Sequence, residues 1–194
     1  MGMLEVHKAM LMETTTPVTL KTLLDSLSTV LVRNCGDALA ARASDQTVTC
    51  SSVPLPEHSA ATMSTLYHSS NPCESGVEGV LCGGFENTYI FYQMKLRTDT
   101  TPSEVRLWLQ AAHARARELG YKSDGKEHCL VFLFVTGVVE ENLKKDMHTW
   151  PDNSVVVPSS ALQRLLKPFG AGFLTLMVEY RSRLLGAPPG KKLV

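Results

Sequence analysis

The sequence has no excess of either charge, no long apolar run and no paired-cysteine spacing. Its 19 Lys and Arg residues balance 19 Asp and Glu residues over 194 positions, so no overall basic field attracts nucleic acid. The longest apolar stretch, Cys129 to Val135, is far too short to cross a bilayer. Residues 1–12 lack the apolar core of a signal peptide. These absences predict an intracellular protein, nuclear or cytoplasmic, with no membrane partner.

Several common sites are also missing from the sequence. The cysteines are odd in number and include no Cys-x-x-Cys pair, which argues against a disulfide framework and against a zinc site. There is no phosphate-binding G-x-x-x-x-G-K-[ST] loop, no Gly-x-Ser-x-Gly elbow and no dinucleotide fingerprint. An ATPase, a serine hydrolase of the elbow type and a nicotinamide-dependent dehydrogenase are therefore not indicated.

The chain divides into an N-terminal helical segment, an α/β domain and a short tail. Thr16 and Pro17 are suited to begin a helix, and leucines at helical spacing continue it to about Val32. A shift to Ser, Thr, Val and Pro near residue 45 marks a boundary. We predict a helical segment over 1–45, an α/β domain over 46–186 and a disordered tail over 187–194.

The α/β domain is predicted from a series of helical and strand patterns. A hairpin is expected between Val77–Cys82 and Thr88–Leu96, with a four-residue turn from Gly84 to Asn87. Thr101, Pro102 and Glu104 then form a capping box for a helix to Leu119. Further patterns predict strands over His128–Val135 and Val155–Val157, a brief helix after Ser159 or Ser160, and a last helix through Phe173, Met177, Tyr180 and Leu184. This order predicts an α/β fold in three layers, with a mixed central sheet flanked by helices.

Three polar residues are predicted to converge on one face of the hairpin. Side chains alternate along a strand, so Gln93 and Lys95 share the face of Phe91. With the four-residue turn, Glu78 lies opposite Gln93 and diagonal to Lys95. The prediction depends on the register, because a slip of one residue sends Glu78 to the other face.

An acid in one strand, followed in the next by an acid or amide, any residue and a lysine, resembles the PD-(D/E)xK nuclease superfamily. The resemblance implies a restriction-endonuclease-like sandwich, in which Glu78 and Gln93 would hold Mg²⁺ and Lys95 would assist the attacking water. Gln93 stands where that pattern has a second acid, and a single carboxylate binds Mg²⁺ weakly. No cofactor is expected unless the nuclease interpretation holds, in which case it is Mg²⁺.

The flanking residues resemble a narrower family. Leu66-Tyr67, Ser70-Asn71, Val77-Glu78-Gly79 and Tyr92-Gln93-Met94-Lys95 are similar to the C-terminal region of retrotransposon hot spot proteins of trypanosomatids. The chain departs from that family in having Glu78 for an aspartate and Lys95 for a threonine. Full-length members also carry a P-loop ATPase region, which is not carried over here.

Arg106, His113 and Arg117, together with Gln110, fall on one stripe of the helix after Thr101 and are candidate contacts to nucleic-acid phosphates. The alternative is a solvated helix face. For Glu78, Gln93 and Lys95 the alternative is an ion pair between Glu78 and Lys95 with Gln93 bonded to the backbone.

Three hypotheses remain open. The first is a nuclease-like domain without strong activity that binds nucleic acid or another protein. The second is an active Mg²⁺-dependent endonuclease, and the third is a purely structural interaction protein. The sequence does not specify the oligomeric state.

Overall fold

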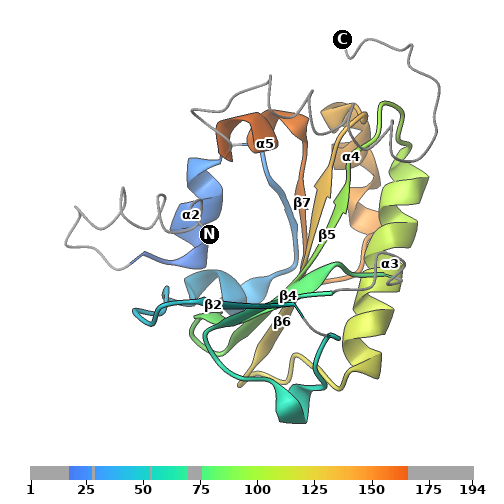
Figure 1. Ribbon diagram of the computed structural model, residues 1–194. Helices are drawn as coiled ribbons and strands as arrows, with labels where there is room; N and C mark the ends of the chain where they lie inside the picture. Colours follow the sequence, from blue (N-terminus) through green and yellow to red (C-terminus); the bar gives the residue numbers. More distant parts are fainter. Residues whose placement is uncertain (1–17, 28, 53, 70–75, 166–194) are drawn as a thin grey trace.

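The computed structural model describes residues 18–27, 29–52, 54–69 and 76–165. Its helices are α2, α3, α4 and α5, the short 3-10 turns are η1, η2 and η3, and the strands are β1 to β7 (Figure 1). In chain order the elements are α2 (Leu20–Ser26), β1 (Leu31–Arg33), η1 (Gly36–Ala40), β2 (Thr49–Ser52), η2 (His58–Ala60), β3 (Thr65–His68), β4 (Gly79–Phe85), β5 (Thr88–Lys95), α3 (Pro102–Glu118), β6 (His128–Val135), α4 (Glu140–Asp146), η3 (Met147–Thr149), β7 (Ser154–Val157) and α5 (Ser159–Leu165).

The strands form one seven-stranded mixed sheet in the order β1-β7-β6-β5-β4-β3-β2. Its centre, β5-β6-β7, is parallel, and β4 runs antiparallel to both of its neighbours. At the two edges, β2 is parallel to β3 and β1 is antiparallel to β7. Parallel neighbours need crossover connections: α3 lies in the one between β5 and β6, α4 in the one between β6 and β7, and the short turn η2 in the one between β2 and β3.

Helices cover the sheet on both faces, which confirms the predicted α/β sandwich (Figure 1). The α3 face of the sheet packs against α3 and α4, and we call the opposite face, which packs against α2, η1 and α5, the α2 face. Strand β5 shows how the period of two divides its side chains: Tyr89 and Phe91 lie in the α3-side core, while Ile90 lies in the α2-side core. No helix within the described residues is both long enough and apolar enough to span a membrane.

The hairpin β4–β5 differs from the prediction in its turn but keeps the predicted register. Phe85 pairs with Thr88, so the turn has only two residues, and Asn87 takes a positive φ of 50° there. The pairing then shifts between Phe85 and Cys82, where Gly83 has a φ of 69° and a β-bulge absorbs the extra residues. Beyond the bulge, Cys82 pairs with Tyr89, as the four-residue turn also required.

Helix α3 forms as its capping box predicts. The Thr101 hydroxyl accepts a hydrogen bond from the Glu104 backbone N–H at 3.3 Å, and the Glu104 carboxylate accepts from the Thr101 N–H at 2.8 Å. These hydrogen bonds lower the pKa of Glu104. Gly120 follows the last turn with a φ of 87°, the left-handed conformation that ends many helices.

The N-terminal segment differs from the prediction. Its helix begins after the Thr19 cap and ends at Ser26, so the predicted continuation to about Val32 is wrong. Leu31–Arg33 instead forms β1, which pairs with β7 at the edge of the same sheet. β-branched Val30 and Val32 have poorer helix propensity than the leucines before them, and the sheet edge offers their backbone partners. The predicted start at Thr16 and the last helix through Phe173 lie outside the described residues.

Candidate functional site

Gln93 and Lys95 lie on the α3 face of β5, but only Lys95 reaches the rim. The Gln93 side chain is 4 % exposed, and its Oε1 atom has no hydrogen-bond partner among the described residues. An unpaired buried amide oxygen costs about 1–3 kcal/mol of stability. Gln93 therefore sits in the core as a poorly satisfied polar group, not at the floor of an open recess.

Glu78 does not join the strand ladder opposite Gln93. The ladder between β4 and β5 ends at Gly79, which pairs with Tyr92, and the Glu78 N–H also donates to the Tyr92 carbonyl at 2.8 Å. Val77 and Val80 both belong to the α3-side core although they are three residues apart. The alternation of faces is therefore interrupted at Glu78 and Gly79, and Val77 occupies the face that strict alternation gives to Glu78.

The carboxylate of Glu78 instead acts on Tyr92, whose ring packs on the α2 face. Burial, and then the nearby charge of Glu78, raise the pKa of Tyr92 to about 12. The Tyr92 hydroxyl lies 2.8 Å from Nδ1 of His68, and their rings are stacked. Within the described residues, no three His, Cys, Asp or Glu side chains are arranged to hold a metal ion.

Lys95 and Arg97 converge on Trp108 of α3. The Lys95 Nζ atom lies 5.7 Å from the centre of a Trp108 ring, and the Arg97 guanidinium carbon lies 5.2 Å from it. Such cation–π contacts are each worth about 0.5–1 kcal/mol at exposed positions. The Glu104 carboxylate also lies at this surface, where it pairs with Arg97 at 3.1 Å.

The loop that carries Arg97 is fastened to the end of β6. The Thr136 hydroxyl donates to the Arg97 carbonyl at 2.6 Å and accepts from the Arg97 N–H at 2.8 Å. Thr100 N–H donates to the Gly137 carbonyl at 2.9 Å, and a Cβ at Gly137 would lie 2.6 Å from the Arg97 carbonyl oxygen. This close approach of two backbones holds Arg97 beside Trp108.

Two members of the predicted phosphate-binding stripe on α3, Arg106 and His113, contact other parts of the protein, while Gln110 and Arg117 are exposed. Arg106 pairs with Asp146 at 3.5 Å, which joins α3 to the end of α4. His113 reaches β7, where its Nε2 lies 2.9 Å from the Ser154 hydroxyl, and burial lowers the pKa of His113 to about 4. Arg117 is exposed, and its Nε donates to the His113 carbonyl at 3.3 Å.

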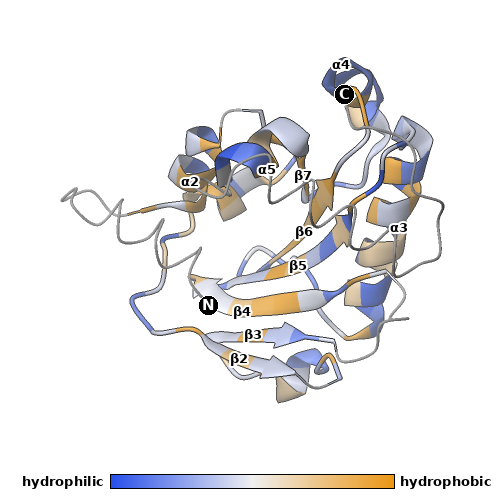
Figure 2. Ribbon diagram, turned by 45° about the horizontal axis from the view of Figure 1, so that its top comes forward, coloured by the Kyte–Doolittle hydropathy of each residue, from blue (hydrophilic) through white to orange (hydrophobic). Residues whose placement is uncertain are grey.

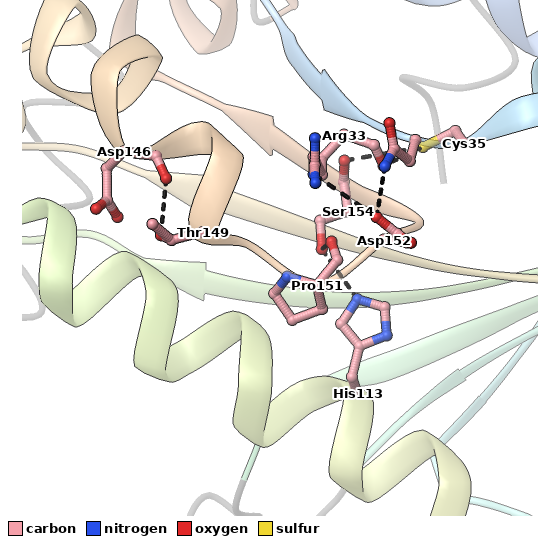
Figure 3. A network of polar contacts seen from close by, with 9 residues as sticks. Arg33, Cys35, His113, Asp146, Thr149, Pro151, Asp152 and Ser154 are labelled. Atoms are coloured by element: carbon pink, nitrogen blue, oxygen red, sulfur yellow. Dashed lines mark hydrogen bonds and ion pairs between the residues drawn. The ribbon is translucent and has the colours of Figure 1, made fainter.

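The contact between Ser154 and His113 is not a nucleophilic pair. Ser154 is fully buried, and its hydroxyl donates to the Pro151 carbonyl at 2.7 Å, so His113 is the donor in their hydrogen bond. Nearby, the Asp152 carboxylate lies 3.6 Å from Arg33 Nε and accepts from Asn34 at 2.7 Å (Figure 3). The network joins β1 and α3 to β7, so its role is structural.

One further polar cluster was not found from the sequence. His58 Nε2 lies 3.0 Å from a Glu127 carboxylate oxygen and 3.2 Å from the Tyr89 hydroxyl, which itself donates to Glu127 at 3.2 Å. Burial and then Glu127 raise the pKa of Tyr89 to about 12, so this phenol is protonated and acts as a donor. The three residues come from distant parts of the chain with no motif spacing, so no sequence signal could have joined them.

Comparison with protein-family models, with curated proteins and with solved structures gives no match to this chain.

Proposed function

We propose that this chain is a nuclease-like domain of the retrotransposon hot spot kind that binds the phosphodiester backbone of nucleic acid and does not cleave it. The strand that follows Glu78 and the strand that carries Gln93 and Lys95 are neighbours in a mixed sheet between helical layers. This is the placement that the resemblance to the PD-(D/E)xK pattern implies, and it supports the proposal at the level of the scaffold.

The absence of cleavage follows from the charges and burial at the candidate metal site. Mg²⁺ needs several oxygen ligands and is usually bound through one or two carboxylates together with waters and substrate phosphates. Here Gln93 replaces one acid and is buried, while the remaining acid, Glu78, lies where the alternation of faces is broken. Glu78 and Gln93 are therefore not positioned to hold Mg²⁺ together.

The observation that carries the binding proposal is the pair of cations at Trp108. Lys95 and Arg97 both lie within 6 Å of its ring, at the end of the strand that bears the nuclease-like pattern. A cation beside an aromatic ring is a common combination for phosphate and base contacts in single-stranded nucleic acid. The neutral net charge of the chain means that binding depends on this local group.

The test combines cleavage and binding on the same substrates. Single- and double-stranded DNA and RNA are incubated with the wild type and with Glu78→Ala, Lys95→Ala, in the presence of Mg²⁺ or Mn²⁺. We expect salt-sensitive binding that the double substitution weakens, without cleavage by either protein. Cleavage that the double substitution abolishes would instead establish an active endonuclease. A folded protein that neither binds nor cleaves any of the four substrates would leave a structural or protein-binding role.

A Lys21→Ala, Lys144→Ala variant is the matched control for charge. Both lysines are exposed, with side-chain exposures of 65 % and 54 %, and each forms an ion pair with an acid on its own helix. The control removes two positive charges, one from α2 and one from α4, neither of which contacts the Trp108 ring as a cation in the described residues. It is compared with Lys95→Ala, Arg97→Ala, which also removes two positive charges. If both variants weaken nucleic-acid binding equally, the proposed surface is refuted.

A further inference from the structure

Glu104 places a carboxylate beside the cations at Trp108. Helix α3 carries both hydrophilic and hydrophobic residues (Figure 2), and Glu104 lies on its first turn. The Oε1 atom of Glu104 accepts a hydrogen bond from Nη1 of Arg97 at 3.1 Å. The same guanidinium group has its carbon 5.2 Å from the Trp108 ring centre. A cation assigned above to phosphate binding is therefore already paired with an anion of its own chain.

The second carboxylate oxygen holds Glu104 in place. Its Oε2 atom accepts from the Thr101 N–H at 2.8 Å and from the Thr101 hydroxyl at 2.9 Å. If Glu104 turned away from Arg97, the Thr101 N–H would lose the acceptor that the capping box provides. These hydrogen bonds also lower the pKa of Glu104, so its carboxylate is ionised at neutral pH. An approaching phosphate thus meets a negative charge that stays beside Arg97.

The ion pair weakens phosphate binding without preventing it. The side chains of Arg97 and Glu104 are 54 % and 36 % exposed, and ion pairs at such positions are weak and screened by salt. A guanidinium group has five N–H donors, and Glu104 accepts from one of them at Nη1. Arg97 can therefore donate to a phosphate while it keeps Glu104, but the two anions then repel each other.

We propose that Glu104 limits the affinity of the Trp108 surface for nucleic acid, because its charge opposes every phosphate that Arg97 binds. The inference rests on the proposed function, since it assigns a role in that function to a further residue of the same surface. The two roles of Glu104 can be separated, because glutamine serves in a capping box as glutamate does but carries no charge. Glu104→Gln should therefore bind single-stranded nucleic acid more tightly than the wild type.

Binding of labelled single-stranded DNA at a series of NaCl concentrations tests the inference. Each phosphate contact to a single strand contributes about 0.7 to the slope of log K against log salt concentration, so removal of a carboxylate that offsets one cation should steepen the slope by about 0.7. The affinity ratio between Glu104→Gln and the wild type should then grow about fivefold for each tenfold fall in salt concentration. The matched control is Glu118→Gln, because Glu118 pairs with Arg115 at 3.3 Å near the other end of α3. We expect the control to leave the slope unchanged.

A second comparison tests whether Glu104 acts through Arg97. In an Arg97→Ala background, Glu104→Gln should increase the affinity less than it does in the wild type, because the two side chains are in contact. Circular dichroism checks that every variant is folded.

The possible failures of the two proposals can be told apart. If the wild type binds through Lys95 and Arg97 but Glu104→Gln binds no more tightly, the inference is overturned and the proposed function stands. Equal gains from Glu104→Gln and Glu118→Gln, or equal gains with and without Arg97, would show a general effect of charge and would also overturn the inference. If neither the wild type nor Glu104→Gln binds, the inference and the proposed function are both overturned.

Discussion

Replacing Gln93 by glutamate would restore the second acid of the nuclease pattern at a position that the core encloses. The Gln93 side chain is only 4 % exposed, and its Oε1 atom is unpaired among the described residues. A carboxylate at this place has no compensating partner, and an uncompensated buried charge costs about 3–5 kcal/mol. For a chain of this length that corresponds to a fall in Tm of roughly 6–20 °C. The loss should shrink at low pH, because burial raises the pKa of the new carboxyl group and protonation then removes its charge.

The response of Gln93→Glu to Mg²⁺ shows whether Glu78 and the new carboxylate can bind one metal ion together. If Glu78 and the new carboxylate faced one recess, Mg²⁺ would bind both of them. A Mg²⁺ concentration of 100 times Kd would then raise the free energy of unfolding by about 2.7 kcal/mol. Because Glu78 lies at the break in the strand alternation, we predict no Mg²⁺-specific gain in Tm for Gln93→Glu relative to the wild type. The assay is thermal unfolding followed by circular dichroism, with NaCl at matched ionic strength as the control. A selective rise of several degrees with Mg²⁺ would refute the reasoning.

A neutral substitution completes this prediction. Gln93→Leu removes the unpaired amide without adding charge, and removal of such a group returns about 1 kcal/mol or more. We therefore expect Gln93→Leu to be at least as stable as the wild type in the same measurement. A large loss of stability would show that the amide has a partner and that Gln93 belongs to a functional network.

Two predictions concern the packing around the site. Burial holds the pKa of His113 at about 4, below its ordinary value of 6.5, so the stability that this group contributes is present above pH 6.5 and is lost as the pH falls toward 4. Between pH 6.5 and pH 4, the free energy of unfolding measured with urea should fall by up to about 3 kcal/mol less in His113→Gln than in the wild type. An equal fall in the two proteins would contradict the assignment. A Cβ at Gly79 would collide with both the Tyr67 carbonyl oxygen and the Tyr92 ring, so Gly79→Ala should cost about 1–3 kcal/mol. Tyr92→Leu removes the ring contact but not the backbone contact, so it should relieve part of that cost, and fully additive losses in the double variant would argue against the collision with the ring.

The parts of the fold that could be predicted from the sequence are those set by local chemistry. The capping box at Thr101 fixes the start of α3, because both of its hydrogen bonds lie within four residues. The apolar run from His128 to Val135 is buried on both faces of a parallel strand, as such runs usually are. The strands β1 and β3 were missed because they are short, three and four residues, and are defined by their partners in the sheet.

At the candidate site, too, the features set by nearby residues could be predicted from the sequence, and those set by distant parts of the chain could not. The register of β4 against β5 was predicted, although the two-residue turn and the bulge that produce it were not. The prediction that Glu78 shares a recess with Gln93 and Lys95 assumed strict alternation of faces, and this alternation is interrupted at Glu78 and Gly79. A bulge at the start of a strand cannot be recognised from the pattern of apolar residues. Nor could the contacts of Trp108 be predicted, because they depend on how α3 lies across β5.

The salt dependence of nucleic-acid binding tests the central claim most directly. Fluorescence anisotropy with labelled single-stranded DNA at a series of NaCl concentrations gives the slope of log K against log salt concentration. Removing two phosphate contacts should reduce that slope by about 1.4 on single-stranded DNA. We predict this reduction for Lys95→Ala, Arg97→Ala and an unchanged slope for Lys21→Ala, Lys144→Ala. An unchanged slope in the first variant, or no binding by the wild type, would contradict the account.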